Sequence, residues 1–178
     1  MTYQTNKRKI INDPVYGFIS IPCDLVFDLI ENPWFQRLRN IRQLGLTSFV
    51  YPGANHSRFQ HCLGAMHLMG LAVNTLRSKG TLISPEEEEA VFCGILLHDI
   101  GHGPFSHALE NSLITGITHE DLSLFLMKKL NKRLSGSLDL AIEIFKGSYK
   151  RKFFHNLITG QPVHIKLSGN QVMKEFSF

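Results

Sequence analysis

The sequence predicts an all-α fold with a short extended segment near the N-terminus. Apolar residues recur at helical spacing through most of the chain, and helix-start signals precede several of these stretches. The chain of 178 residues is 43% hydrophobic and carries mixed charge, which suffices for one core and excludes wholesale disorder. We therefore expect one helical domain over residues 1–160, followed by a tail of uncertain structure over residues 161–178.

The first elements are an extended segment and two helices. Residues 15–21 are expected to be extended, and residues 23–30 to be helical. Asn32 and Pro33 then predict the start of a second helix, as its N-cap and its first residue. An apolar stripe in that helix is assigned to the core: Phe35, Leu38, Ile41 and Leu44. The arginines around it are interpreted as ordinary surface charges: Arg37, Arg39 and Arg42.

A turn and a long apolar helix come next. Residues 51–55 are rich in helix breakers, which puts His56 and Arg58 at a junction between a loop and a helix. Residues 61–76 are apolar on nearly all sides and predict a buried central helix. His67 in that helix is interpreted as a core or helix-edge residue.

The next helix begins with a strong capping signal. Ser84, Pro85 and Glu87 have the spacing of an N-cap, a first-position proline and a capping box. The acids at 86–89 resemble a metal cluster but are better explained as charges that stabilise the positive helix end. The helix is expected to deliver His98 and Asp99 near its C-terminal end, where glycines and a proline at 101–104 break it.

Histidines are concentrated in one stretch of the chain. Seven of the nine fall there: His56, His61, His67, His98, His102, His107 and His119. A single histidine is more often a surface or hydrogen-bonded core residue, but the cluster indicates a metal site. Neutral imidazole and carboxylate bind Mn, Fe, Co, Ni and Zn, and a bound ion lowers the pKa of its water toward neutrality. His155 and His164 lie outside this stretch and are interpreted as incidental.

Four ordered blocks now carry a family resemblance. They are the segments 56–61 (His-Ser-Arg-Phe-Gln-His), 98–99 (His-Asp), 101–107 (Gly-His-Gly-Pro-Phe-Ser-His) and 118–120 (Thr-His-Glu). The chain resembles the HD-domain metal-dependent phosphohydrolases, and among them the deoxynucleoside triphosphate triphosphohydrolases, including the sterile-alpha-motif and HD-domain dNTPase. The similarity covers roughly residues 10–130 and implies an HD-domain helical bundle for residues 1–160.

The resemblance implies a metal site and a reaction. It matches three residues to the family's first metal ligands: His61, His98 and Asp99. They would hold one divalent ion (Mn, Fe, Ni, Co, Zn or Mg). In the resembling enzymes attack occurs at the α-phosphorus and releases a nucleoside and inorganic triphosphate.

The resemblance also implies the residues around the metal. Arg58 matches a phosphate-facing arginine. Three histidines match the positions that stabilise the transferred group and the leaving oxygen: His102, His107 and His119. His107 is the expected leaving-group acid, with Glu120 or another acid supporting a histidine. The Thr118 block has a second interpretation as a helix cap.

One family feature is missing. The fourth ligand is an aspartate in a motif of the type Asp-x-Asp-Arg-x-Asp-Tyr, which this sequence does not contain. Asp139 is interpreted as an acid on the wet face of an amphipathic helix, and the hypothesis is a shortened or frame-altered chain. An open site works with three protein ligands, so metal binding is expected to be weakened rather than abolished.

Several functions therefore stay open. The first is hydrolysis of deoxynucleoside triphosphates. The alternatives are a weakened or truncated HD module that binds nucleotide or a partner protein, or an HD hydrolase of guanosine polyphosphate or nucleoside monophosphate. A measurement of substrate turnover would distinguish an active hydrolase from a weakened or truncated HD module.

The composition of the chain limits which partners and which cellular location we expect for it. Three separated cysteines argue against a disulfide framework or a cysteine zinc cluster. The net charge of +4 gives only weak support to nucleic-acid binding. No signal peptide or membrane-length apolar run is present, so we expect a cytoplasmic chain with no membrane partner. The resemblance implies homo-oligomers, which no repeat or heptad pattern here settles.

Overall fold

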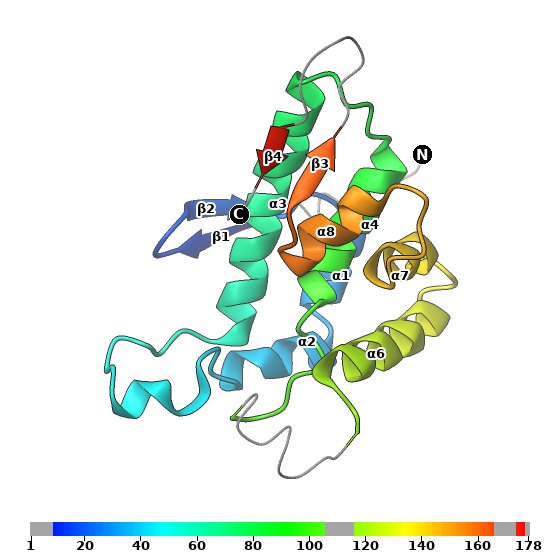
Figure 1. Ribbon diagram of the computed structural model, residues 1–178. Coiled ribbons are helices and arrows are strands. Elements are labelled where there is room, and N and C mark those ends of the chain that lie inside the picture. The colour runs from blue at the N-terminus through cyan, green and yellow to red at the C-terminus, as the bar shows by residue number, and fades with distance from the viewer. Residues whose placement is uncertain (1–8, 106–115, 166–173, 177–178) are drawn as a thin grey trace, which may run out of the picture.

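The computed structural model describes residues 9–105, 116–165 and 174–176, and these residues are mainly helical (Figure 1). The elements in chain order are β1 (Ile10–Asp13), β2 (Gly17–Ser20), α1 (Asp24–Ile30), α2 (Pro33–Gln36), η1 (Arg37–Asn40), η2 (Gly45–Phe49), α3 (Arg58–Ser78), α4 (Pro85–Leu97), α6 (His119–Arg133), α7 (Asp139–Phe145), α8 (Lys152–Thr159), β3 (Val163–Ile165) and β4 (Lys174–Phe176). This order confirms the predicted helical class.

The N-terminal extended segment is one arm of a β-hairpin. β1 and β2 pair antiparallel, from Ile10 opposite Ser20 to Asp13 opposite Gly17. The Asp13 carboxylate closes the turn by accepting hydrogen bonds from the amides of Val15 and Tyr16, at 2.8 and 3.0 Å. The predicted extended segment is therefore present, together with a partner strand that the sequence interpretation did not include.

The second helix is shorter than predicted. Asn32 is the N-cap, since its side chain accepts a hydrogen bond from the Trp34 amide at 3.0 Å. The α-helix lasts one turn and continues as the 3-10 helix η1, which ends at Asn40. Leu44 was assigned to the core stripe, but it is 46% exposed because the helix ends before it. The other three residues of the stripe are buried: Phe35, Leu38 and Ile41.

α3 and α4 lie side by side at the centre of the molecule (Figure 1). Each begins with the same device, a capping box of a serine and the third helical residue: Ser57 with Gln60, and Ser84 with Glu87. α4 is buried along most of its length. α3 is not buried all round, because its Leu68 and Leu71 are 43% and 52% exposed.

α7 and α8 cover the other side of α4. In the tail, β3 and β4 form a short antiparallel pair, from Val163 opposite Phe176 to Ile165 opposite Lys174. Among the helices that the structure describes, none has the length and hydropathy needed to cross a bilayer. The bundle thus leaves the first turn of α3 and the last turn of α4 next to each other, at the end where α6 begins.

Candidate metal centre

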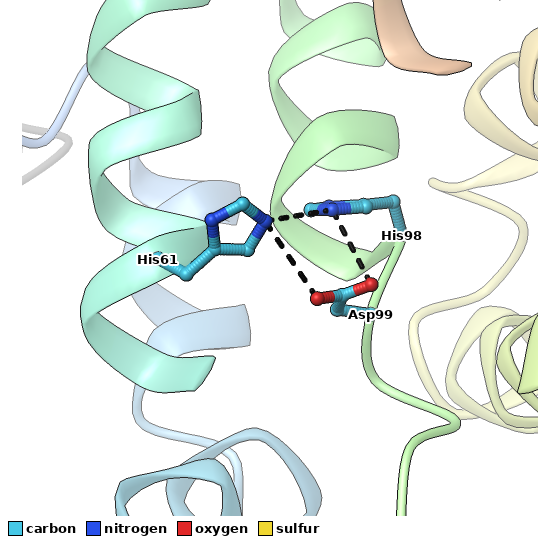
Figure 2. A group of neighbouring side chains, drawn as sticks. All are labelled: His61, His98 and Asp99. Atoms are coloured by element: carbon cyan, nitrogen blue, oxygen red, sulfur yellow. Dashed lines mark hydrogen bonds and ion pairs between the residues drawn. The ribbon is translucent and has the colours of Figure 1, made fainter. Parts of the chain in front are cut away.

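Two helices bring the predicted ligands together. His61 lies in the first turns of α3, while His98 is the C-cap of α4 and Asp99 follows it. Figure 2 shows the two rings and the carboxylate converging: His61 Nε2 lies 3.3 Å from His98 Nε2 and 3.7 Å from Asp99 Oδ2, and His98 Nε2 lies 3.4 Å from Asp99 Oδ1. One donor atom from each residue fits within 4.8 Å, so the arrangement has the composition of a metal site.

The surroundings of His98 and His61 leave a ring nitrogen of each available to bind a cation. His98 Nδ1 lies 2.6 Å from the carbonyl oxygen of Ile95. A carbonyl only accepts, so Nδ1 carries a hydrogen, and Nε2 is the ring nitrogen that faces the cluster and can bind a cation. Burial, together with the nearby His98, lowers the pKa of His61 to about 4. His61 is therefore neutral at pH 7, which is the form in which an imidazole binds a divalent ion.

Asp99 is held as a carboxylate by its neighbours. Burial by itself would raise the pKa of Asp99, but His102, His98 and Arg58 outweigh burial and hold that pKa well below its usual range. The Arg58 Nη1 donates to Asp99 Oδ2 at 2.5 Å, and its side chain is 2% exposed. Arg58 was expected to face a phosphate, and the structure places it against this carboxylate.

His102 and His119 stack beside the cluster. Their ring centroids are 4.0 Å apart with an interplanar angle of 18°. His102 Nε2 lies 3.4 Å from Asp99 Oδ1, and burial lowers the pKa of the His102 ring. His102 is therefore a neutral residue that supports Asp99, and His119 lies one ring further out.

Gly101 permits this close approach of α6. A β-carbon at position 101 would lie 2.2 Å from the carbonyl oxygen of His119 and 2.4 Å from the amide nitrogen of Ser123. Both of these atoms belong to the backbone of α6, so no side-chain movement would relieve the contact. α4 ends at Leu97, before the break predicted at this glycine, and the packing of α6 is the reason that position 101 has no room for a side chain.

The remaining site predictions have mixed outcomes. Thr118 caps α6 and forms a capping box with Asp121, which confirms the cap interpretation. The Glu120 side chain is 65% exposed, and its Oε1 lies 3.6 Å from His119 Nε2. His107 falls outside the described residues. Asp139 accepts a hydrogen bond from Asn131 at 2.6 Å and is not part of the cluster, as the sequence interpretation held.

A cavity of about 600 Å³ opens beside the cluster. One part of its wall carries His98, Asp99, His119 and Glu120, and another is built by the end of α7 and by α8, including His155. His155 was interpreted as incidental because it lies far from every motif. Only the packing of α8 brings it to this wall, so no local pattern could have indicated it.

Comparison with known proteins agrees with the site. The HD domain family model matches residues 58–159. The deoxynucleoside triphosphate triphosphohydrolase SAMHD1 homolog of Dictyostelium discoideum is 42% identical over 133 residues, which are 70% of this chain and 26% of that protein. SAMHD1 of Homo sapiens is 40% identical over 130 residues, 68% of this chain and 21% of that protein.

Two further matches extend over more of the chain. The Bacillus subtilis protein YwfO is 34% identical over 171 residues, 90% of this chain and 39% of that protein. The crystal structure of a phosphohydrolase from Bacteroides thetaiotaomicron has a TM-score of 0.84 at 56% identity, over 86% of this chain and 38% of that one. The chain thus spans between 21% and 39% of the length of these four proteins.

The HD family model covers more than half of the chain, and its range includes all three residues of the cluster. The shared segment extends over most of the chain in each relative above. The chain therefore belongs to the HD-domain phosphohydrolase family and is homologous to the SAMHD1 deoxynucleoside triphosphate triphosphohydrolases.

Proposed function

We propose that this chain is a divalent-metal-dependent phosphohydrolase that hydrolyses deoxynucleoside triphosphates to a nucleoside and inorganic triphosphate. The observation that carries the proposal is the convergence of His61 with His98 and Asp99, the last two of which lie on the wall of a cavity of about 600 Å³. A cavity of that size lies in the range of small-molecule sites. The names of the SAMHD1 relatives supply the substrate class.

The three ligands fit the ion by their chemistry. Two neutral imidazoles and one carboxylate together carry a single negative charge, which suits a divalent ion that must also bind water and a phosphate oxygen. A bound divalent ion polarises a phosphoryl oxygen and makes its water a better nucleophile. The identity of the ion stays open, since this ligand set accepts Mn, Fe, Ni, Co, Zn or Mg.

Two further residues act through Asp99. Arg58 donates to Oδ2 and His102 lies beside Oδ1, so together they keep the carboxylate ionised and fix its plane. Arg58 is deeply buried and serves the proposed reaction by holding Asp99. A phosphate contact by Arg58, which the resemblance implies, would require it to leave this carboxylate.

His119 and Glu120 face the proposed substrate. Both line the cavity, and Glu120 Oε1 lies 3.6 Å from His119 Nε2. A hydrogen bond from His119 would stabilise charge on the phosphoryl group. His107 keeps its proposed role as the leaving-group acid, on the resemblance alone.

The test is a product analysis on the purified chain. The chain is first assayed for bound metal by elemental mass spectrometry, then incubated with each deoxynucleoside triphosphate and Mn²⁺, and products are separated by ion-exchange chromatography. Deoxynucleoside and inorganic triphosphate in equal amounts are expected, and both should disappear in His98→Ala. Turnover of a nucleoside monophosphate or of a guanosine polyphosphate instead would replace the proposed reaction by the alternative named from the sequence.

A second function is favoured by one observation. Within the described residues no fourth acid joins the cluster, and Asp139 is committed to Asn131. A three-ligand centre of this kind could bind nucleotide with little or no turnover. Nucleotide binding in equilibrium dialysis with Mn²⁺, without any product, would assign the chain to this class. Homo-oligomers, nucleic-acid binding and the cytoplasmic location stay predictions.

A further inference from the structure

The backbone that follows the metal cluster leaves carbonyl groups without helical partners. α4 ends at Leu97, and a tight turn over residues 97–102 continues it, with the Ile100 amide bonded to the Leu97 carbonyl and the His102 amide bonded to the Asp99 carbonyl. Carbonyls beyond a helix end need other donors when they are buried. This turn carries His98, Asp99 and His102, so its conformation sets the geometry of the cluster.

One donor comes from a distant part of the chain. The Arg37 guanidinium donates from Nη1 to the His102 carbonyl at 2.8 Å and from Nη2 to the Ile100 carbonyl. Arg37 begins η1, and these two acceptors are 65 and 63 residues away in sequence. A planar guanidinium can bridge two carbonyls in a fixed geometry, whereas an ammonium group is a single point of charge.

Ser123 holds the opposite side of the same turn. Its hydroxyl donates to the His98 carbonyl and accepts from the Gly101 amide, both at 2.8 Å, and the residue is fully buried. The turn is therefore fixed from η1 on one side and from α6 on the other. Movement of this turn would carry the His102 ring away from Asp99.

We propose that Arg37 is a positioning residue of the metal centre: by bridging the Ile100 and His102 carbonyls it fixes the turn that presents His98, Asp99 and His102. It touches neither the proposed metal nor the substrate, and it acts through the backbone. The inference rests on the proposed metal-dependent function. The sequence interpretation had assigned Arg37 to the surface, and its neighbour Arg39 offers a matched comparison.

The experiment compares Arg37→Lys and Arg37→Gln with Arg39→Lys. Arg39 lies in the same 3-10 helix but is exposed, donates to Gln36 and lies over the Phe59 ring. The affinity of each folded variant for Mn²⁺ is measured by competition with a fluorescent chelator. Outer groups that orient metal ligands commonly affect affinity by about 10- to 100-fold. We expect Kd to rise about tenfold or more in both Arg37 variants and to stay unchanged in Arg39→Lys.

Activity gives an independent measurement. Arg37→Lys should lower kcat while the KM for the nucleotide changes little, because the parts of the cavity wall built by α6, α7 and α8 are unaltered. Unchanged Mn²⁺ affinity in Arg37→Lys and Arg37→Gln would overturn the inference and leave the proposed function standing. A wild-type chain that binds no metal would overturn the proposed function itself. Circular dichroism at the assay temperature confirms that the variants compared are folded, and the milder Arg37→Lys serves if Arg37→Gln does not fold.

Discussion

The two ends of α4 each carry a buried acid paired with an arginine, and the two acids have opposite surroundings. At the N-terminal end, the Glu87 carboxylate accepts hydrogen bonds from Tyr149 at 2.7 Å, from Arg151 at 2.6 Å and from the Ser84 amide at 3.0 Å. At the C-terminal end, Asp99 accepts from Arg58 and also faces the converging rings of His61 and His98.

The difference separates a charge that the protein itself satisfies from a charge that faces a candidate metal site. Around Glu87, donors converge on both carboxylate oxygens, so the charge is satisfied by the protein itself. At the other end, two ring nitrogens approach to 3.3 Å beside a carboxylate, an arrangement that requires a proton or a cation between acceptors. The first set fastens α4 to the start of α8, and the second is suited to bind an ion.

The largest effect is expected from removing the ligand pair. His98→Ala with Asp99→Ala should abolish metal binding and turnover, because two of the three ligands are lost. The Asp99 change also removes the carboxylate that faces the buried Arg58 guanidinium, which should lower the free energy of unfolding by about 3–5 kcal/mol. Elemental analysis and urea denaturation measure the two losses.

The single change His98→Ala provides the control. It should remove metal with a smaller loss of stability, since the Asp99 and Arg58 pair is kept. Retention of near-stoichiometric metal by the double variant would exclude this cluster as the metal centre. Equal stability of the two variants would contradict the structural role of the ion pair.

Much of this comparison depends on contacts that sequence patterns do not contain. The helix starts at Ser57, Ser84 and Thr118 were predictable, since a capping box joins residues three apart. The resemblance identified His61 with His98 and Asp99, whose proximity the structure supports. The partners of the two acids were not predictable, because Arg58 is 41 residues from Asp99 and Arg151 is 64 residues from Glu87.

The same limit explains the incorrect expectations. Leu44 continued an apolar stripe in the sequence, but the chain leaves helical geometry at Asn40 and the stripe stops. Leu68 and Leu71 belong to an apolar stretch, yet only one side of α3 is covered by α4. Periodicity indicates which residues could be buried, whereas the packing of other elements decides which of them are.

The second prediction concerns the charge of Glu87 at the N-terminal end of α4. Glu87→Gln keeps the shape and a capping amide but removes the charge that faces Arg151, so we expect a loss of about 1–3 kcal/mol in unfolding free energy. Metal affinity should not change. Glu88→Gln is the matched control, because Glu88 pairs with Arg77 at 2.7 Å in a more exposed position, where a salt bridge contributes at most about 1 kcal/mol. A fall in metal affinity with Glu87→Gln would show that the two ends are coupled.

The third prediction uses pH to distinguish what the two ends of α4 contribute to the stability of the metal-free chain. The pKa of His61 is lowered to about 4 and that of His102 is lowered as well, so between about pH 6.5 and 4 the unfolded chain binds protons that the folded chain does not. Stability should therefore fall as pH drops below about 6.5. His61 is 37% exposed, so solvent screening should keep its share below about 2 kcal/mol.

The stability that ionised Glu87 contributes at the other end of α4 should be lost only at lower pH. Burial opposes ionisation of Glu87, but the hydrogen bonds from Tyr149, Ser84 and Arg151 prevail and lower its pKa. Its contribution is present above the unfolded pKa of about 4.5 and is lost as pH falls through the folded value. Thermal melts from pH 7 to 3 should show both phases in the wild type. A His61→Gln variant that keeps the full loss between pH 6.5 and 5 would contradict this assignment.

The smallest effect is expected from removing the serine caps of α3 and α4. Ser57→Ala and Ser84→Ala each remove a hydroxyl that accepts the amide of the third helical residue, at 3.3 and 3.2 Å, and each should cost about 1 kcal/mol. The two substitutions should differ in their effect on the affinity for Mn²⁺. Ser57 caps the turn that leads to His61, whereas Ser84 lies a whole helix away from His98. We expect Mn²⁺ affinity to fall a few-fold in Ser57→Ala alone, and an equal fall in Ser84→Ala would mean that α4 transmits fraying from one end to the other.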